Sequence, residues 1–228
     1  HYGLSLVLGG AEGTLWDITG AYASMARTLN NYFNVIGEKR YDKNDFHPPT
    51  YLEASDLEKE NGELTATSWL NASGIWLTFE TLKELYRPGE ETGWRYFNST
   101  KPIAWKTGTS FGFRDGWAVG TNPEYTIGVW VGNADGEGRP GLTGTDMAAP
   151  LLFDMFSLLP GQPWFQQPLS EMEQIKVCAI SGQRMSSNCG SPNTIWVTSA
   201  GLQTQSCEYH KKIHLTEDEQ FQVNLNCE

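Results

Sequence analysis

Three strand-like segments follow one another near the middle of the chain, at residues 103–109, 115–121 and 125–131. Each is rich in β-branched and aromatic residues, and each is bounded by turn-forming residues. Asn122-Pro123-Glu124 is a short turn between the second and third segments. This arrangement favours an antiparallel sheet.

Helical patterns lie on both sides of these strands. Residues 14–30 place apolar side chains every three or four positions, behind Thr14 as a capping residue. A second helix is predicted from Asn71 or Ser73 to about Tyr86. A third runs from about residue 145 to 159, with Thr145 or Asp146 as its cap. The predicted fold class is therefore α+β, an antiparallel sheet covered by helices.

The segment 160–168 contains three prolines and is predicted to link two domains. Residues 1–163 form the larger predicted domain. Residues 170–228 form a small β-rich, cysteine-containing domain, with short strands at 194–198 and 221–225.

The charge balance excludes several partners. The 228 residues carry a net charge of −11, and no block of lysine or arginine is present. A nucleic acid or an anionic membrane surface is therefore not expected as a partner. No stretch approaches the length of a transmembrane helix, and no cofactor is predicted.

The first strand carries the string Lys106-Thr107-Gly108-Thr109-Ser110. A lysine supplies a fixed positive charge, and threonine hydroxyls can hold a carboxylate. Gly108 lets a ligand backbone lie close, because it has no Cβ. A nearby backbone N–H can point at a developing oxyanion. Alone, such a string is more often a solvated strand lysine beside solvent-facing threonines.

The Lys-Thr-Gly string and four other segments together resemble a known family. Lys-Thr-Gly is the third signature of the serine penicillin-binding proteins and β-lactamases. Residues 4–12 resemble the LSLALGGAE segment of the bifunctional penicillin-binding proteins, and residues 114–126 resemble the hairpin after their Lys-Thr-Gly strand. Residues 177–184 and 207–210 resemble the tail of those with a small C-terminal domain. The resemblance covers nearly the whole chain and implies the C-terminal part of the penicillin-binding transpeptidase fold.

The resemblance also implies an activity. In this family a serine attacks the penultimate D-Ala carbonyl of a peptidoglycan stem peptide, and the terminal D-Ala leaves. An amine from a second strand then resolves the acyl-enzyme. Lys106 would keep the pocket positive, Thr107 and Thr109 would bind the terminal carboxylate, and Thr109 N–H would donate to the oxyanion. Gly108 and Ser110 would complete the substrate-binding strand. Expected partners are stem peptides, β-lactam antibiotics and cell-wall synthesis proteins, at the periplasmic face of the bacterial inner membrane.

The nucleophile motif of this family is missing from the chain. No serine is followed by lysine three residues later. Ser186-Ser187-Asn188 spells Ser-x-Asn, but it follows Lys106, whereas the family places this motif earlier. We therefore expect the first two motifs before His1 and a fragment that is inactive alone. The resemblance also implies a glycosyltransferase domain and a membrane anchor before His1. The alternative is a non-catalytic module that binds cell-wall peptide or a partner protein through the sheet edge and the cysteine-containing domain.

Four cysteines lie close together near the end of the chain: Cys178, Cys189, Cys207 and Cys227. The favoured reading is two disulfides, Cys178–Cys189 and Cys207–Cys227, with no metal, because a small domain buries too little core to fold unaided. The alternative is a zinc site built from the first three cysteines and His210, since Cys-x-x-His has ligand-like spacing.

Three further charged side chains could be interpreted as catalytic, but their positions favour structural roles. Arg114 and Asp115 are adjacent on a strand, so their side chains point to opposite faces. We expect them to anchor the turn into the strand. Glu12 precedes a capped helix, where a carboxylate stabilises the helix N-terminus.

Overall fold

A computed structural model describes residues 3–34, 40–51, 64–87 and 101–223 of the 228-residue chain. Residue contacts divide the chain into two compact units, His1–Pro168 and Leu169–Glu228. Each is described separately below. Within the described ranges, no helix has the length and apolar character needed to cross a lipid bilayer.

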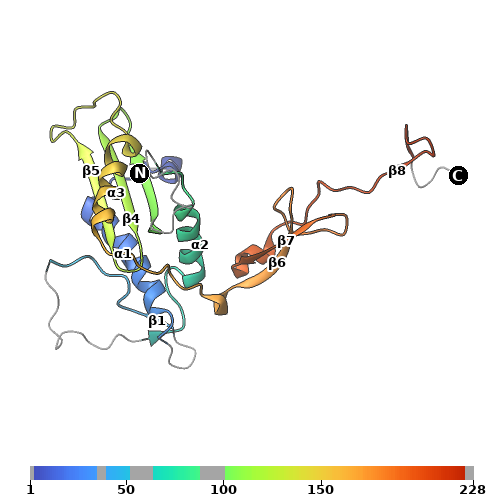
Figure 1. The fold of residues 1–228 in the computed structure, drawn as a ribbon, viewed down its shortest axis with the longest axis horizontal. Helices are drawn as coiled ribbons and strands as arrows, with labels where there is room; N and C mark the ends of the chain where they lie inside the picture. The colour runs from blue at the N-terminus through green and yellow to red at the C-terminus, as the bar shows by residue number, and fades with distance from the viewer. Residues whose placement is uncertain (1–2, 35–39, 52–63, 88–100, 224–228) are drawn as a thin grey trace. The chain divides into compact units, whose positions relative to one another are not determined.

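The centre of the first unit is an antiparallel sheet in the order β3-β4-β5 (Figure 1). Strand β3 spans Ala104–Thr109, β4 spans Asp115–Thr121 and β5 spans Thr126–Gly132. These bounds confirm the three predicted strands to within one residue at each end. The turn between β4 and β5 is fixed by Asn122, whose Oδ1 accepts hydrogen bonds from the backbone N–H of Glu124 (3.0 Å) and of Tyr125 (2.7 Å).

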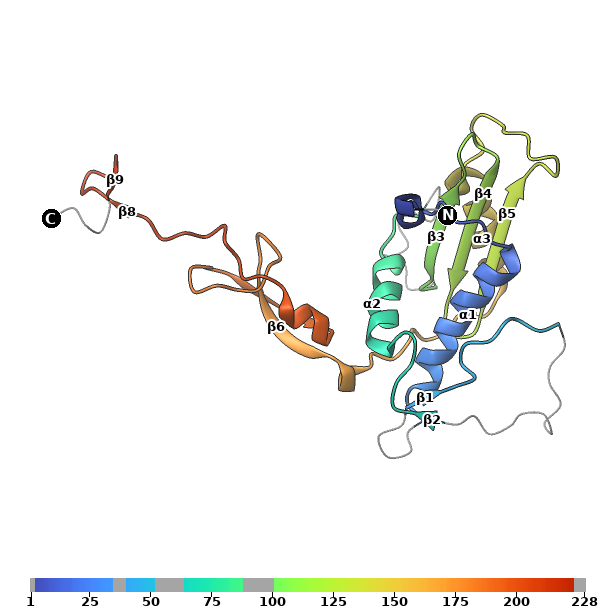
Figure 2. The ribbon, with the colours of Figure 1, turned by 180° about the vertical axis from the view of Figure 1, so that it is seen from behind.

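Helices cover both faces of this sheet, so the unit has three layers (Figures 1 and 2). Helices α1 (Leu15–Asn31) and α2 (Ala72–Lys83) lie on one face. Helix α3 (Ala149–Leu158) and the turn before it lie on the other. Each interface has its own buried cluster: Leu29 and Phe79 belong to the first, Leu152 and Phe156 to the second. The predicted α+β arrangement is thus observed.

The N-termini of α1 and α2 follow ordinary capping chemistry. The Thr14 hydroxyl accepts a hydrogen bond from Asp17 N at 3.0 Å and donates to the Asp17 carboxylate at 2.6 Å. At α2 the Asn71 side chain accepts from Gly74 N at 3.1 Å. Both satisfy backbone donors that have no partner inside the helix. Helix α2 ends at Lys83, earlier than the predicted end near Tyr86.

The third helix begins differently from the prediction. Thr143, and neither Thr145 nor Asp146, is the capping residue: its hydroxyl accepts from Asp146 N at 3.1 Å and donates to the Asp146 carboxylate at 2.6 Å. The first turn, η3 (Gly144–Ala148), is a π-helix. The Ala149 N–H donates to the carbonyl of Gly144, five residues earlier, and Pro150 follows in the first turn of α3.

The proline-containing segment after α3 packs onto the first unit. Phe165 is buried, and its ring lies 5.4 Å from that of Phe79 in α2. Trp164 packs edge-on against Phe165 at 5.1 Å and against the Lys83 ammonium at 4.9 Å. Phe165 and Trp164 therefore attach the predicted linker to the first unit, because their packing removes aromatic surface from water.

Smaller elements complete the first unit. A 3-10 helix, η1, spans Gly3–Leu8. Strands β1 (Tyr41–Asp42) and β2 (Leu64–Thr65) pair as a short antiparallel ladder.

The second unit consists of short antiparallel pairs and single-turn helices. Strand β6 (Glu173–Cys178) pairs with β7 (Pro192–Val197), and β8 (His214–Leu215) pairs with β9 (Gln222–Val223). The 3-10 helices are η4 (Leu169–Glu171) and η5 (Ser199–Gln203).

Candidate functional site

Strand β3 carries the Lys-Thr-Gly-Thr string and lies at the edge of its sheet. Its one partner is β4, and no strand in the described part of the chain pairs with its other side. Ser110 N donates to Asp115 O at 3.0 Å, so Ser110 faces β4. Along a strand, the N–H and C=O groups of successive residues point alternately to one side of the strand and to the other. The N–H and C=O groups of Thr107 and Thr109 therefore point to the open edge.

The side chains of Thr107 and Thr109 lie on the same face of the sheet as buried Trp105. The Trp105 ring packs at 5.0 Å against Phe153 of α3, which identifies this face as the one covered by α3. Lys106 and Gly108 alternate to the opposite face, together with Ala104. The string is thus divided between the two faces of one edge strand.

A group of hydroxyls gathers where β3 meets the π-helical turn. Gly144 N donates to Thr109 Oγ1 at 3.0 Å, and Thr107 Oγ1 lies 3.5 Å from Thr145 Oγ1. Because the Thr109 oxygen accepts from Gly144, its own hydroxyl hydrogen is free to donate to a ligand. Thr145, assigned by the sequence only as a helix cap, is a further exposed hydroxyl at this place.

The Lys106 side chain is exposed and reaches the open edge. Its Nζ donates to the backbone carbonyl of Thr107, one of the groups that point away from β4. The ammonium therefore lies beside the edge of β3 that no described strand pairs with. The Lys106 Cβ itself is on the opposite face of the sheet from the side chains of Thr107 and Thr109.

Gly108 and Ser110 have different structural positions. A Cβ on Gly108 would meet nothing closer than Trp117 Cβ at 3.6 Å, an ordinary contact. Internal packing therefore does not require glycine there. The Ser110 hydroxyl accepts from Asp115 N at 2.8 Å, so it holds the β3–β4 turn.

Asp115 anchors the entry to β4, as the sequence predicted. Besides its backbone bonds to Ser110, its Oδ1 accepts from Trp130 Nε1 at 2.9 Å. This carboxylate is engaged within the sheet, which agrees with a structural role.

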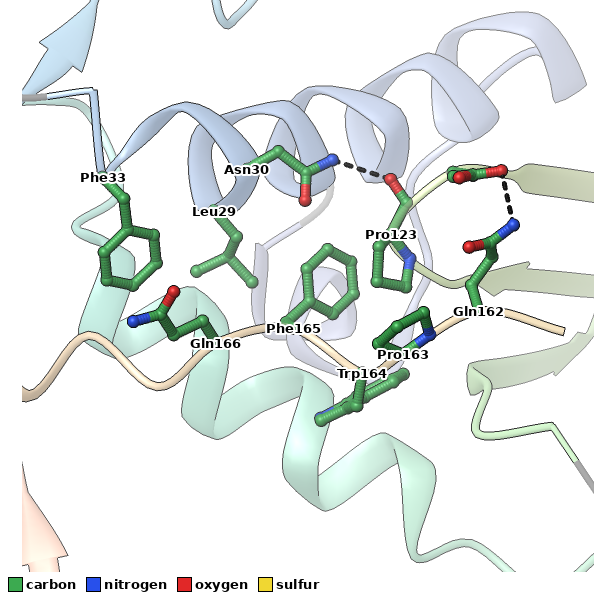
Figure 3. Close-up of a pocket in the computed structure, with 10 residues that line it drawn as sticks. Leu29, Asn30, Phe33, Pro123, Gln162, Pro163, Trp164, Phe165 and Gln166 are labelled. Atoms are coloured by element: carbon green, nitrogen blue, oxygen red, sulfur yellow. Dashed lines mark hydrogen bonds between the residues drawn. The ribbon is translucent and has the colours of Figure 1, made fainter. Parts of the chain in front are cut away.

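A pocket of about 360 Å³ lies at the opposite end of the sheet (Figure 3). It is lined by the end of α1, the β4–β5 turn and residues 162–166. Asn30 Nδ2 donates to Pro123 O at 2.7 Å, and Gln162 Nε2 donates to Glu124 Oε2 at 2.8 Å, which ties these parts together. The pocket contains no member of the Lys106–Ser110 string.

In the second unit, three cysteines and one histidine converge. Cys178, Cys189 and Cys207 are buried and carry free thiols, and all lie around His210. The structure thus lacks the expected Cys178–Cys189 bridge and presents the residues of the alternative ligand set. Cys227, the expected partner of Cys207, lies outside the described residues. Ser186 and Asn188 belong to this cluster's loop: Ser186 Oγ lies 3.3 Å from Cys189 Sγ, and Asn188 donates to His210 O at 3.1 Å.

Hydrogen bonds favour the thiolate form within this cluster. Those made by the Ser181 hydroxyl and by His210 lower the pKa of Cys207 to about 5. The pKa of Cys178 is also lowered, chiefly by hydrogen bonding to Ser181. Thiolates are the form in which cysteine binds metal ions.

Comparison with known proteins relates the chain to penicillin-binding proteins. It is 31% identical over 156 residues to penicillin-binding protein 1C of Escherichia coli, which is 68% of this chain and 17% of that protein. It is 25% identical over 205 residues to penicillin-binding protein 1A of Clostridium perfringens, or 82% of this chain and 23% of that protein. No family model matches the chain.

Penicillin-binding protein 1A of Neisseria gonorrhoeae is 28% identical over 153 residues, 66% of this chain and 18% of that protein. Among solved structures, penicillin-binding protein 1A from Haemophilus influenzae aligns with 58% of this chain and 21% of its own, at 19% identity and a TM-score of 0.41. The chain spans about a fifth of the length of these curated relatives. It is distantly homologous to class A penicillin-binding proteins over part of its length.

Proposed function

We propose that residues 1–168 are the C-terminal part of a serine D,D-transpeptidase domain of the penicillin-binding protein 1C type, and that β3 binds its peptide substrate. Two observations support this. The chain is related in sequence to penicillin-binding protein 1C. The Lys106-Thr107-Gly108-Thr109 string lies on a strand whose outer edge has no strand partner among the described residues.

The substrate, a peptidoglycan stem peptide ending in D-Ala-D-Ala, lies along β3 as an added antiparallel strand. The outward N–H and C=O groups of Thr107 and Thr109 supply the main-chain hydrogen bonds of such pairing. The Thr107 and Thr109 hydroxyls hold the terminal carboxylate, and Lys106 adds a positive charge. The Thr109 N–H donates to the oxyanion that forms when a serine attacks the penultimate carbonyl.

Gly108 carries this proposal. At most of the closely packed glycines in this unit, neighbouring atoms leave no room for a side chain. A Cβ on Gly144, for example, would lie 2.4 Å from both Gly108 O and Trp117 O. At Gly108 the chain leaves room for a side chain and yet has none. A ligand backbone lying against β3 gives this position a reason to be glycine.

The attacking serine comes from another part of the protein, since no Ser-x-x-Lys occurs in these 228 residues. β-Lactam antibiotics acylate the same serine. The protein works at the periplasmic face of the bacterial inner membrane, alongside cell-wall synthesis proteins, with an anchor and a glycosyltransferase domain elsewhere in the gene product.

Labelling with a fluorescent penicillin tests the proposal. The full-length gene product is expected to become covalently labelled in a one-to-one ratio, at a serine outside this chain. The chain of residues 1–228 is expected to remain unlabelled. A label on a serine within residues 1–228, or an unlabelled full-length product, contradicts the proposal.

A second candidate is a non-catalytic module that binds cell-wall peptide or a partner protein at the edge of β3. The absence of Ser-x-x-Lys from the sequence favours it. The two candidates differ in one measurement: a binding module in the full-length product binds stem peptide without any covalent labelling by penicillin.

A further inference from the structure

We propose that Cys178, Cys189, Cys207 and His210 form a binding site for one structural zinc ion in the second unit. The four ligand atoms all lie within 4.8 Å of one another. This inference is independent of the transpeptidase proposal, since it concerns residues of the second unit alone.

The sulfur–nitrogen distances match a tetrahedral ZnS3N centre. His210 Nδ1 lies 3.4 Å from Cys207 Sγ, 3.5 Å from Cys178 Sγ and 3.6 Å from Cys189 Sγ. With zinc–sulfur bonds of about 2.3 Å and zinc–nitrogen bonds of about 2.0 Å, a tetrahedron requires sulfur–nitrogen separations of roughly 3.5 Å. Three nearly equal separations from one nitrogen are expected around a common centre. A disulfide would draw two of the sulfurs to about 2.05 Å and break this symmetry.

The backbone brings the ligands together from three places in the sequence. Cys178 is the last residue of β6, and Cys189 precedes β7, its partner strand. Arg184, between them, pairs with Val177 on one side and with Ser206 on the other. Its carbonyl accepts from Cys207 N at 2.8 Å, which places Cys207 and then His210 beside the hairpin. The chain is therefore folded around the cluster by main-chain hydrogen bonds.

Donors directed at the sulfurs suit thiolate ligands. Ser181 N lies 3.5 Å from Cys178 Sγ, and Ser186 N lies 3.4 Å from Cys189 Sγ. The Ser181 hydroxyl donates to Cys207 Sγ at 3.2 Å. Every cysteine of the set thus has a hydrogen-bond donor within the protein. Such outer contacts orient metal ligands and balance their negative charge.

The second unit also needs a cross-link. Its buried hydrophobic cluster, within the described residues, consists of the three cysteines with partly buried Met185 against them. A unit of about 60 residues rarely folds stably on so little apolar burial. Four protein ligands close the coordination sphere, so the ion would be structural, with no position open for catalysis. Three thiolates and one imidazole favour zinc over calcium or magnesium, which prefer oxygen ligands.

Metal analysis of the purified 228-residue chain tests the site. Native mass spectrometry and elemental analysis are expected to find one zinc ion per chain. Replacement by cobalt(II) is expected to give the thiolate charge-transfer bands and intense visible bands of tetrahedral cobalt. An octahedral cobalt spectrum, or a chain without bound zinc after zinc is supplied, overturns the proposal.

Variants distinguish zinc from disulfides. Cys189→Ser and His210→Ala are expected to lower the zinc content from one per chain to well below one. His214→Ala, a histidine outside the cluster, and Cys227→Ser are expected to keep it at one. If the first two variants do not fold, the cobalt spectrum of the unaltered chain decides. A Cys178–Cys189 or Cys207–Cys227 disulfide in non-reducing peptide mapping of the zinc-supplied protein refutes the site.

Discussion

Gly144 N donates a 3.0 Å hydrogen bond to Thr109 Oγ1, which joins the π-helical turn before α3 to the end of the edge strand. The contact is close because Gly144 has no side chain, and it fixes the direction of the Thr109 hydroxyl. The carboxylate-binding threonine of the proposed site is thus positioned by a backbone N–H group of this turn.

Substitution by alanine should change the stability of the first unit at Gly144 but hardly at Gly108. A Cβ on Gly144 would lie 2.4 Å from two backbone carbonyl oxygens, so we expect Gly144→Ala to lower the free energy of unfolding by about 1–3 kcal/mol. Gly108→Ala has room for its methyl group, and we expect a change within about 0.5 kcal/mol. Urea unfolding of both variants measures this. Equal destabilisation would mean that packing, and not a ligand, requires Gly108.

Lys106 should matter far more for acylation than Arg114, which lies in the turn between β3 and β4. In the full-length gene product we expect Lys106→Ala to lower the second-order rate of acylation by penicillin about 10²–10³-fold, because a charge next to the reacting carbonyl is lost. Arg114→Ala is expected to change this rate less than about tenfold. Stopped-flow labelling of both variants gives the comparison, and equal losses would contradict the role assigned to Lys106.

Phe165 should contribute to the stability of the first unit although it lies in a proline-containing segment. Its buried ring packs against Phe79, and we expect Phe165→Ala to cost about 3 kcal/mol of unfolding free energy. Leu158→Ala is the control, since that side chain is 86% exposed and should change stability by about 0.5 kcal/mol or less. Thermal unfolding of the two variants checks this. Equal shifts would show that the segment is a free linker.

Periodicity and turn chemistry predicted most of the first unit. The turn residues that follow residues 115–121 predicted the end of β4, and Thr14 caps α1 as its sequence indicates. The predicted cap of the third helix was wrong: Thr145 and Asp146 were the two candidates, and Thr143, just before them, is the capping residue. The choice among them depends on how the turn meets β3, which is a tertiary contact.

The positions of the site residues depend on similar long-range effects. The Lys106-Thr107-Gly108-Thr109 string could be recognised from sequence, but its division between two faces of an edge strand follows from the pairing of β3 with β4. The ligand-like spacing of Cys207 and His210 could be recognised from the sequence. Cys178 and Cys189 lie beside them because of the β6–β7 hairpin and of Arg184, which pairs with Val177 and with Ser206. No local sequence pattern indicates this pairing of Arg184.

Asp45 should make stability depend on pH. Its side chain is 2% exposed; Oδ1 accepts from Asn31 at 2.7 Å, while Oδ2 has no hydrogen-bond partner among the described residues. Burial raises the pKa of this carboxyl above its ordinary value. Between the unfolded and the folded pKa, the native state binds more protons than the unfolded state, so the free energy of unfolding falls as pH rises through that range.

Asp45→Asn removes this titration and keeps the shape of the side chain. We therefore expect the variant to gain stability relative to the unaltered chain as pH is raised from about 4 to 7, the interval that begins near the ordinary pKa of aspartate. Ser24→Ala serves as the control, since it alters the same α1 surface without changing a titrating group. Chemical unfolding of all three proteins across this range measures the difference. A stability difference between Asp45→Asn and the unaltered chain that stays constant, or shrinks, with rising pH would show that burial does not disfavour the Asp45 carboxylate.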